Sequence, residues 1–135
     1  MKNLKFTVLL LPFILLITSC SSSKWLEGKW EGTGNQVSGE TWEVNLNYTD
    51  KEHISIKYPD LSCGGVWTLL KENKKEIVFK ENIAYGISNC DQGVEAFVSK
   101  INENTIKVEY YLRAYDSINP LAEATLYKST KKVKQ

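Results

Sequence analysis

Several features that would mark a common enzyme or metal site are missing from this sequence. It contains a single histidine and no C-x-x-C pair, which excludes histidine-rich metal centres and the usual dithiol redox motif. It has no G-x-S-x-G, P-loop or G-x-G-x-x-G motif, so the nucleophile and phosphate sites that these motifs mark are not expected. Asp50, Glu52 and His53 fall together in a predicted hairpin turn, where solvated turn residues are the simpler interpretation. We therefore expect no metal and no cofactor.

An excess of positive charge is also missing, and this argues against a nucleic-acid-binding protein. The chain has 17 basic and 16 acidic residues. Two of the basic residues, Lys2 and Lys5, lie in a segment that we expect to be removed, and the rest of the chain is then close to neutral. The lysines of the C-terminal tail could contact acidic lipid headgroups, but we interpret this tail as a solvated terminus.

The longest apolar run lies at the N-terminus and is too short to span a membrane. Phe6–Ile17 is apolar apart from Thr7, whereas a hydrocarbon core needs about 20 helical residues. A short positive stretch precedes this run, and small residues follow it at Thr18 and Ser19. This three-part pattern is typical of a secretory signal peptide, which we place at residues 1–19.

The end of this segment carries a resemblance to a known class of exported proteins. Ile17-Thr18-Ser19-Cys20 resembles the lipobox of bacterial lipoproteins, in which an aliphatic residue and two small ones precede a modified cysteine. The resemblance implies lipid on the Cys20 sulfur, cleavage before Cys20 and acylation of the new N-terminus, and two or more acyl chains anchor a protein stably. Ser21, rather than an aspartate, follows the cysteine, which in that class implies release to the outer membrane. We predict a lipid-anchored protein of the bacterial cell envelope.

The two remaining cysteines favour a disulfide. Cys63 and Cys90 both lie in turn-like sequence, and an exported compartment permits the bond. In the chain-entropy model a bridge of this loop length stabilises a protein by about 3–4 kcal/mol. The alternative, a catalytic or redox thiol, has no evident base nearby in the sequence.

The remainder of the chain predicts a single all-β domain. Between Thr41 and Thr49, and again between Thr105 and Arg113, apolar and polar residues alternate with period two, as in a strand with one face on a core. Polar turns separate shorter candidates of the same kind. The other predicted strands are Lys29–Asn35, His53–Tyr58, Gly65–Glu72, Glu76–Asn82, Gly93–Ile101 and Ala122–Lys128.

Eight strands with mostly tight connections predict an antiparallel meander. Closing such a sheet into a barrel, or nearly so, removes the exposed strand edges, and a β-sandwich is the alternative. The prediction for the whole chain is therefore a signal-peptide helix (1–19), a lipidated tether (20–27), a β-barrel domain (28–128) and a basic tail (129–135).

A second resemblance concerns the start of the predicted barrel. Gly28-Lys29-Trp30 before an eight-strand meander resembles the G-x-W motif of the lipocalin and calycin superfamily. In that group the tryptophan packs across one barrel end against a basic residue from the last strands. The resemblance implies that Trp30 stacks on Arg113, the single arginine of this sequence.

Aromatic residues are plentiful, and they predict where a ligand would bind. Aromatic walls with a few polar groups are typical of a pocket for a small ligand, although the same rings could simply fill a small core. We expect the binding residues in the loops at 83–93 and 114–120 and on inward strand positions. The candidates are Trp42, Trp67, Tyr85, Tyr110 and Tyr115.

Three hypotheses for function follow from this sequence. The leading one is a non-enzymatic envelope protein that binds a small apolar or amphipathic ligand in the barrel mouth. The second is a protein-interaction module, such as an inhibitor of a hydrolase that attacks the envelope, by analogy of fold alone. The third is an enzyme that uses converging carboxylates, of which the sequence offers several.

Overall fold

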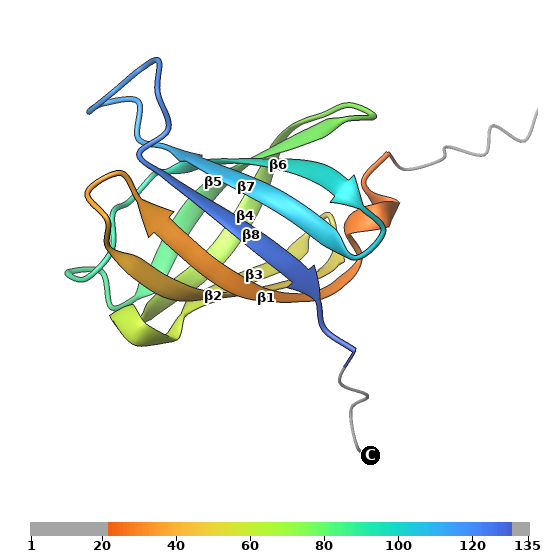
Figure 1. Cartoon of the computed structure of the whole chain (residues 1–135), viewed down its shortest axis with the longest axis horizontal. Helices are drawn as coiled ribbons and strands as arrows, with labels where there is room; N and C mark the ends of the chain where they lie inside the picture. Colours follow the sequence, from red (N-terminus) through yellow and green to blue (C-terminus); the bar gives the residue numbers. More distant parts are fainter. Residues whose placement is uncertain (1–21, 131–135) are drawn as a thin grey trace, which may run out of the picture.

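The computed structural model describes residues 22–130, which form one closed β-barrel (Figure 1). The predicted signal peptide, Cys20 and the last five residues of the predicted tail lie outside the described residues. Within the described part, no helix combines the length and the apolar character that a membrane span requires. Among the described residues, the hydrophobic core runs from Leu26 to Leu126.

The eight strands follow one another around the barrel in chain order, and each pairs antiparallel with its neighbours. Pairing of the first strand with the last closes the sheet, which confirms the predicted meander barrel and excludes the β-sandwich. Two short 3-10 helices, η1 (Lys24–Leu26) and η2 (Pro59–Leu61), complete the elements. The strands are β1 (Gly28–Gln36), β2 (Thr41–Asp50), β3 (His53–Tyr58), β4 (Cys63–Glu72), β5 (Glu76–Tyr85), β6 (Glu95–Asn102), β7 (Thr105–Tyr111) and β8 (Ala122–Lys128).

The period-two alternation of the sequence determines which side chains face the barrel interior. On β2 the buried positions are Val44, Leu46 and Tyr48, and the residues between them are more exposed. On β7 the buried positions are Ile106 and Val108, followed by Tyr110. Each aliphatic side chain buried in this way contributes roughly 1.5–3 kcal/mol relative to an exposed position. These residues fill one half of the barrel.

The first described residues close this filled end of the barrel. The indole nitrogen of Trp30 donates a 2.8 Å hydrogen bond to the carbonyl of Leu26 in η1. The hydroxyl of Tyr48 donates to the Ser23 hydroxyl at 2.9 Å, and Ser23 is buried. The predicted tether is therefore too long, because Ser23 and Leu26 belong to the folded domain.

The basic residue over Trp30 is not the one that the calycin resemblance implies. The ammonium nitrogen of Lys128 lies 5.1 Å from the Trp30 ring centre, and these two residues are paired across β1 and β8. Arg113 instead lies over the rings of Phe97 and Tyr111, at 5.4 and 4.5 Å. This corrects the expected Trp30–Arg113 contact. Arg113 follows the end of β7 that lies beside the start of β8, whereas Trp30 pairs with the last residue of β8.

The other end of the barrel is formed by four long or irregular connections. These are the β1–β2 turn, η2, the β5–β6 loop and the β7–β8 loop, all on the side away from η1 (Figure 1). The predicted disulfide is confirmed and lies at this end, because Cys63 of β4 is bonded to Cys90 of the β5–β6 loop across 27 residues. Their Cα atoms are 6.3 Å apart.

Candidate functional site

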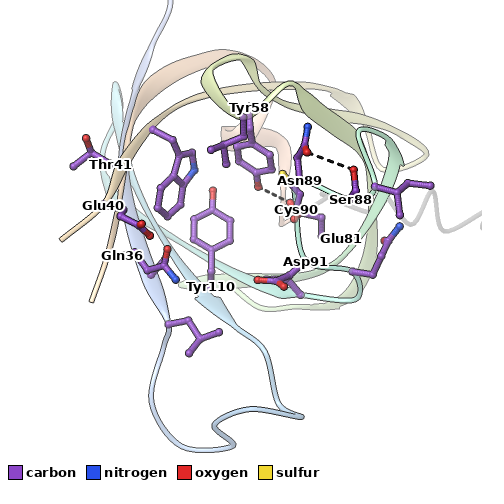
Figure 2. A pocket seen from close by; sticks show the side chains of 17 residues that line it. Gln36, Glu40, Thr41, Tyr58, Glu81, Ser88, Asn89, Cys90, Asp91 and Tyr110 are labelled. Atoms are coloured by element: carbon purple, nitrogen blue, oxygen red, sulfur yellow. Dashed lines mark hydrogen bonds between the residues drawn. The ribbon is translucent and has the colours of Figure 1, made fainter. Parts of the chain in front are cut away.

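A cavity of about 640 Å³ lies at the end of the barrel opposite η1. Its walls come from the β1–β2 turn, from the strands β2, β3, β5 and β7, and from the β5–β6 loop (Figure 2). This volume falls in the range of pockets that hold a small organic ligand. The barrel therefore has one filled end and one hollow end, which we call the mouth.

A buried carboxyl group, Glu81, lies at the inner side of this cavity. Alternation along β5 turns Ile77, Phe79 and Ile83 inward, and Glu81 occupies the same inward row with only 3% of its surface exposed. Its Oε2 atom accepts hydrogen bonds from the Tyr58 hydroxyl at 2.5 Å and from the Trp67 indole nitrogen at 2.8 Å. An acid in an apolar row must be satisfied by such donors, because a buried carboxylate without them costs several kcal/mol.

Burial dominates the electrostatics of Glu81. Removal from water raises the pKa of this carboxyl above its ordinary value, and the negative charge of Asp91 raises it further. The hydrogen bonds from Tyr58 and Trp67 act in the opposite direction but do not cancel the effect of burial. A positive group placed beside Glu81 would lower this pKa again.

The buried hydroxyl of Tyr110 makes no hydrogen bond of ordinary geometry among residues 22–130, and the Tyr58 hydroxyl is the polar group that interacts with it. Tyr110 is 5% exposed and lines the cavity, and Figure 2 shows its hydroxyl directed into the lumen of the barrel. Its ring lies edge-on to that of Tyr58, with the ring centres 6.5 Å apart. Burial raises the pKa of Tyr110 so far that the hydroxyl stays neutral. Buried hydroxyls are nearly always paired, so a hydroxyl without a well-formed hydrogen bond beside a cavity is a candidate position for a ligand atom or water.

A third aromatic wall is formed by Trp42 of β2. It is half-buried, lines the cavity and is paired across the sheet with Gly34 of β1. A Cβ atom at Gly34 would lie 2.6–2.8 Å from the indole ring, so only glycine lets the ring lie flat against β1. The glycine therefore positions this wall of the cavity.

The β5–β6 loop is held firmly over the cavity. The side-chain amide of Gln92 pairs with the backbone of Ile83 in both directions, each hydrogen bond measuring 2.9 Å. The disulfide at Cys90 ties the same loop to β4. A wall with these restraints is preorganised, which lowers the entropic cost of binding.

The charged residues that line the cavity are all acidic. Glu40, Glu81 and Asp91 contribute to its walls, and no lysine, arginine or histidine among the described residues does. These acids come from different segments, namely the β1–β2 turn, β5 and the β5–β6 loop. No group of three histidine, cysteine or acidic side chains suited to a metal ion is found in the described part of the chain. Within the described residues, the cavity wall therefore combines three acids with no basic side chain.

The five predicted ligand-binding residues do not all lie at the cavity. Trp42 and Tyr110 line the cavity. Trp67 is buried and stacks on Phe79, so that it supports the cavity through its hydrogen bond to Glu81. Tyr85 is half-exposed with its hydroxyl beside Gly64, and Tyr115 is 81% exposed on the β7–β8 loop. Neither Tyr85 nor Tyr115 lines the cavity.

Two central residues were missed as ligand-binding candidates. Tyr58 and Glu81 both face inward, and the alternation of their strands contains the signal. Glu81 stands two residues from Phe79 and two from Ile83, so the period that places these apolar side chains in the core also places the acid there. Tyr58 follows Ile54 and Ile56 on β3 in the same way. Of the two predicted loops, the one at 83–93 lines the cavity, whereas residues 114–120 do not.

Comparison with known proteins places the fold among small β-barrels. One solved structure, described as EF1p2_mFAP2b bound to DFHBI, superposes with a TM-score of 0.58 at 12% identity, covering 80% of this chain and 97% of that one. A second, described as the redesigned β-barrel b11L5F_LGL, gives a TM-score of 0.50 at 13% identity, covering 82% and 97%. At these identities the likeness shows the fold alone. No protein-family model matches the sequence, and no curated protein matches it.

Proposed function

We propose that this protein binds a small amphipathic ligand in the mouth of its barrel and performs no chemistry on it. The observation that carries the proposal is the cavity of about 640 Å³ at the mouth of the barrel, with Trp42, Tyr58 and Tyr110 in its walls. A barrel that only needed a core would fill this space, since protein interiors pack as densely as organic crystals. Aromatic walls at Trp42 and Tyr58, with polar groups at a few positions, are typical of ligand pockets.

Two resemblances support this proposal without deciding it. The barrel described as EF1p2_mFAP2b is bound to DFHBI, so a closed barrel of this general shape can hold a small molecule. The G-x-W motif at Gly28 and Trp30 is similar to that of the lipocalin and calycin superfamily, whose members share the meander barrel. The site itself, rather than the fold, is what indicates binding here.

We further propose that the domain is held on the envelope membrane by lipid on Cys20. The lipobox resemblance supports this, and so does the position of η1 at the filled end of the barrel (Figure 1). Few residues separate Cys20 from the buried Ser23, and an extended chain of this length spans only about 10 Å. In this arrangement the filled end lies near the membrane and the mouth opens away from it.

The binding proposal can be tested with residues 21–135 and the neutral, environment-sensitive dye Nile red. A rise in dye fluorescence that saturates at one dye per protein is expected. The variant Ala122→Phe places a ring in the cavity, because Ala122 lines it, and should abolish the signal. The matched control Ala84→Phe adds the same ring at an exposed position of β5 and should leave the signal unchanged. Equal dye binding by both variants, or none by the unaltered protein, would contradict the proposal.

A second candidate function is supported by the β7–β8 loop, which projects from the barrel (Figure 1). It exposes 81% of Tyr115 and 79% of Ile118. Asp116 accepts hydrogen bonds from the backbone of Ile118 and Asn119, and Arg113 bonds to the carbonyl of Ser117, so the loop has a defined shape. Exposed aromatic and apolar side chains on a rigid loop are typical of a protein contact.

This candidate can be tested separately from ligand binding. The envelope-hydrolase inhibitor hypothesis predicts that residues 21–135 slow the cleavage of peptidoglycan by a muramidase. The double variant Tyr115→Ser with Ile118→Ser should lose that inhibition but keep Nile red binding. No inhibition across a panel of such hydrolases would leave the ligand-binding proposal in place and remove this form of the second candidate.

A further inference from the structure

The charge of the cavity wall is one-sided, although the chain as a whole is close to neutral. Glu40, Glu81 and Asp91 are the charged residues that line the cavity within the described part of the chain. The chain has 16 acidic and 17 basic residues, so a random share of the surface would contribute bases as well. A concave site lined by charge of one sign concentrates a field of that sign inside it, because its low-dielectric walls screen poorly.

The same cavity presents aromatic surface beside these acids. Trp42, Tyr58 and Tyr110 all line it, and the rings of Tyr58 and Tyr110 lie edge-on at 69°. The faces of aromatic rings carry partial negative charge and attract organic cations, with quaternary ammonium groups as the best-known case. Two or three such walls around one space form the arrangement that binds ammonium groups.

The hydrogen-bond donors and acceptors of the inner wall are compatible with a positively charged group on the ligand. The two donors that point at Glu81, the Tyr58 hydroxyl and the Trp67 indole nitrogen, are already used by its Oε2 atom. The Tyr110 hydroxyl is buried, interacts with that of Tyr58 without a well-formed hydrogen bond, and can accept a hydrogen bond from an ammonium N–H. An anionic ligand would meet three acids here and no basic side chain.

A bare metal ion fits these walls less well than an organic cation does. Metal ions need several oxygen, nitrogen or sulfur ligands around a single point. No group of three suitable histidine, cysteine or acidic side chains comes together within residues 22–130. Aromatic faces contribute nothing to such coordination, whereas they provide much of the binding surface for an alkylammonium group.

From these observations we infer that the ligand is an amphipathic organic cation, an amine or quaternary ammonium compound, whose positive group lies near Glu81 between the aromatic walls and whose apolar part fills the mouth. This inference rests on the proposed ligand-binding function and adds the chemical class of the ligand. It also assigns Glu81, Tyr58, Tyr110 and Trp42 as the residues that select the charge.

The inference is tested with probes that have the same shape and different charge. Benzyltrimethylammonium, its neutral isostere 2,2-dimethylpropylbenzene and the anion 3-phenylpropanoate are titrated by competition against Nile red on residues 21–135. The cation should bind at least about tenfold more tightly than the neutral isostere, which corresponds to one good cation–aromatic contact with charge assistance. The anion should bind more weakly than either.

Two variants that each remove one acidic charge test whether Glu81 is the source of the preference for the cation. Glu81→Gln keeps an oxygen that can accept from Tyr58 and Trp67, so the fold is expected to persist. It should reduce the affinity for the cation by about tenfold and leave the neutral isostere unaffected. Glu52→Gln removes the same charge from a turn at the filled end and should change neither affinity.

The outcomes separate this inference from the function on which it rests. If the neutral isostere binds as tightly as the cation, or the anion binds best, the inference is overturned while ligand binding stands. If Glu81→Gln and Glu52→Gln weaken cation binding equally, the effect comes from overall charge and the assignment to Glu81 is wrong. If neither Nile red nor any of the three probes binds, the proposed function itself fails.

Discussion

The Tyr58 hydroxyl donates a 2.5 Å hydrogen bond to the carboxyl group of Glu81, and the two residues face each other from β3 and β5 inside the barrel. Both are buried, at 4% and 3% exposure. This contact joins the filled half of the barrel to the hollow one, because Tyr58 and Glu81 also line the cavity. A change at this pair is therefore expected to affect both stability and the proposed binding.

Removing the donor of this pair should destabilise the fold. Tyr58→Phe leaves the buried Glu81 with one of its two hydrogen bonds, which should lower the free energy of unfolding by about 1–3 kcal/mol. Urea denaturation followed by tryptophan fluorescence measures this change. Tyr127→Phe removes a hydroxyl from a tyrosine with 59% of its surface exposed and serves as the matched control, with no expected change beyond about 0.5 kcal/mol. Equal stability of the two variants would mean that the Tyr58–Glu81 hydrogen bond makes no net contribution to the free energy of unfolding.

The raised pKa of Glu81 predicts how stability depends on pH. The folded state holds this proton above the ordinary value of 4.5 and the unfolded state releases it there, so the folded state binds more protons in that window. The contribution of Glu81 is therefore fully present below about pH 4.5 and is lost as the pH rises through its raised pKa. Other acids with lowered pKa values, such as Asp116, have the opposite trend at lower pH.

The difference between two proteins isolates this effect. The free energy of unfolding of Glu81→Gln minus that of the unaltered protein should grow as the pH rises from about 4.5 through the raised pKa of Glu81, and then level off. Urea titrations at intervals of pH measure it. A difference that stays constant with pH would show that the pKa of this carboxyl is not raised in the folded state, and a difference that shrinks would show that it is lowered.

The buried hydroxyl of Tyr110 predicts opposite effects on stability and on binding. Tyr110→Phe removes a buried polar group that has no well-formed hydrogen bond among residues 22–130, and it should stabilise the empty protein by up to about 1 kcal/mol. The same change should lower the affinity for benzylammonium, which can donate to the hydroxyl, by about three- to tenfold. It should leave the affinity for benzyltrimethylammonium, which has no N–H group, unaffected. Lower stability of the variant would show that the hydroxyl is satisfied in solution, for example by water.

The disulfide should contribute to stability and to the shape of the mouth. Replacing Cys63 and Cys90 together by serine should lower the free energy of unfolding by about 3–4 kcal/mol, from the 27 residues that the bond encloses. Nile red affinity should fall as well, because the β5–β6 loop that carries Cys90 is one wall of the cavity. Thiol labelling of the unreduced protein provides the control, since modification of either cysteine would show that the bond does not form.

The fold could be predicted from the sequence because alternation is local. Along β2 or β7, each step between an apolar and a polar residue assigns a side chain to the inside or the outside of the sheet, whatever the other strands are. Eight such strands with short turns leave few possible sheet topologies. The disulfide followed from the number of cysteines and from the exported character of the predicted leader. The predicted bounds of His53–Tyr58 and Ala122–Lys128 match the structure, and the ends of the other predicted strands differ from it by at most three residues.

The site could be predicted only in part, because it depends on which residues meet across the barrel. Alternation places Tyr110 inside but cannot show that its hydroxyl meets Tyr58 without a well-formed hydrogen bond. The hollow end arises where small side chains such as Ala122 and Val94 face inward between loops, and no local pattern distinguishes these positions from a filled core. The expected Trp30–Arg113 contact was wrong for a related reason. A residue that comes late in the sequence can lie at either end of the barrel, so the late position of Arg113 does not place it beside Trp30.

Native mass spectrometry of residues 21–135, purified gently from the envelope fraction of the host, tests ligand binding most directly. The account predicts a reproducible additional mass of small-molecule size on the unaltered protein, and its absence from the Ala122→Phe variant, whose cavity is filled. Release of the molecule should then show whether it carries a positive charge. An unaltered protein that is bare in repeated preparations, or an additional mass retained equally by Ala122→Phe, would contradict the claim that the mouth of this barrel is a binding site.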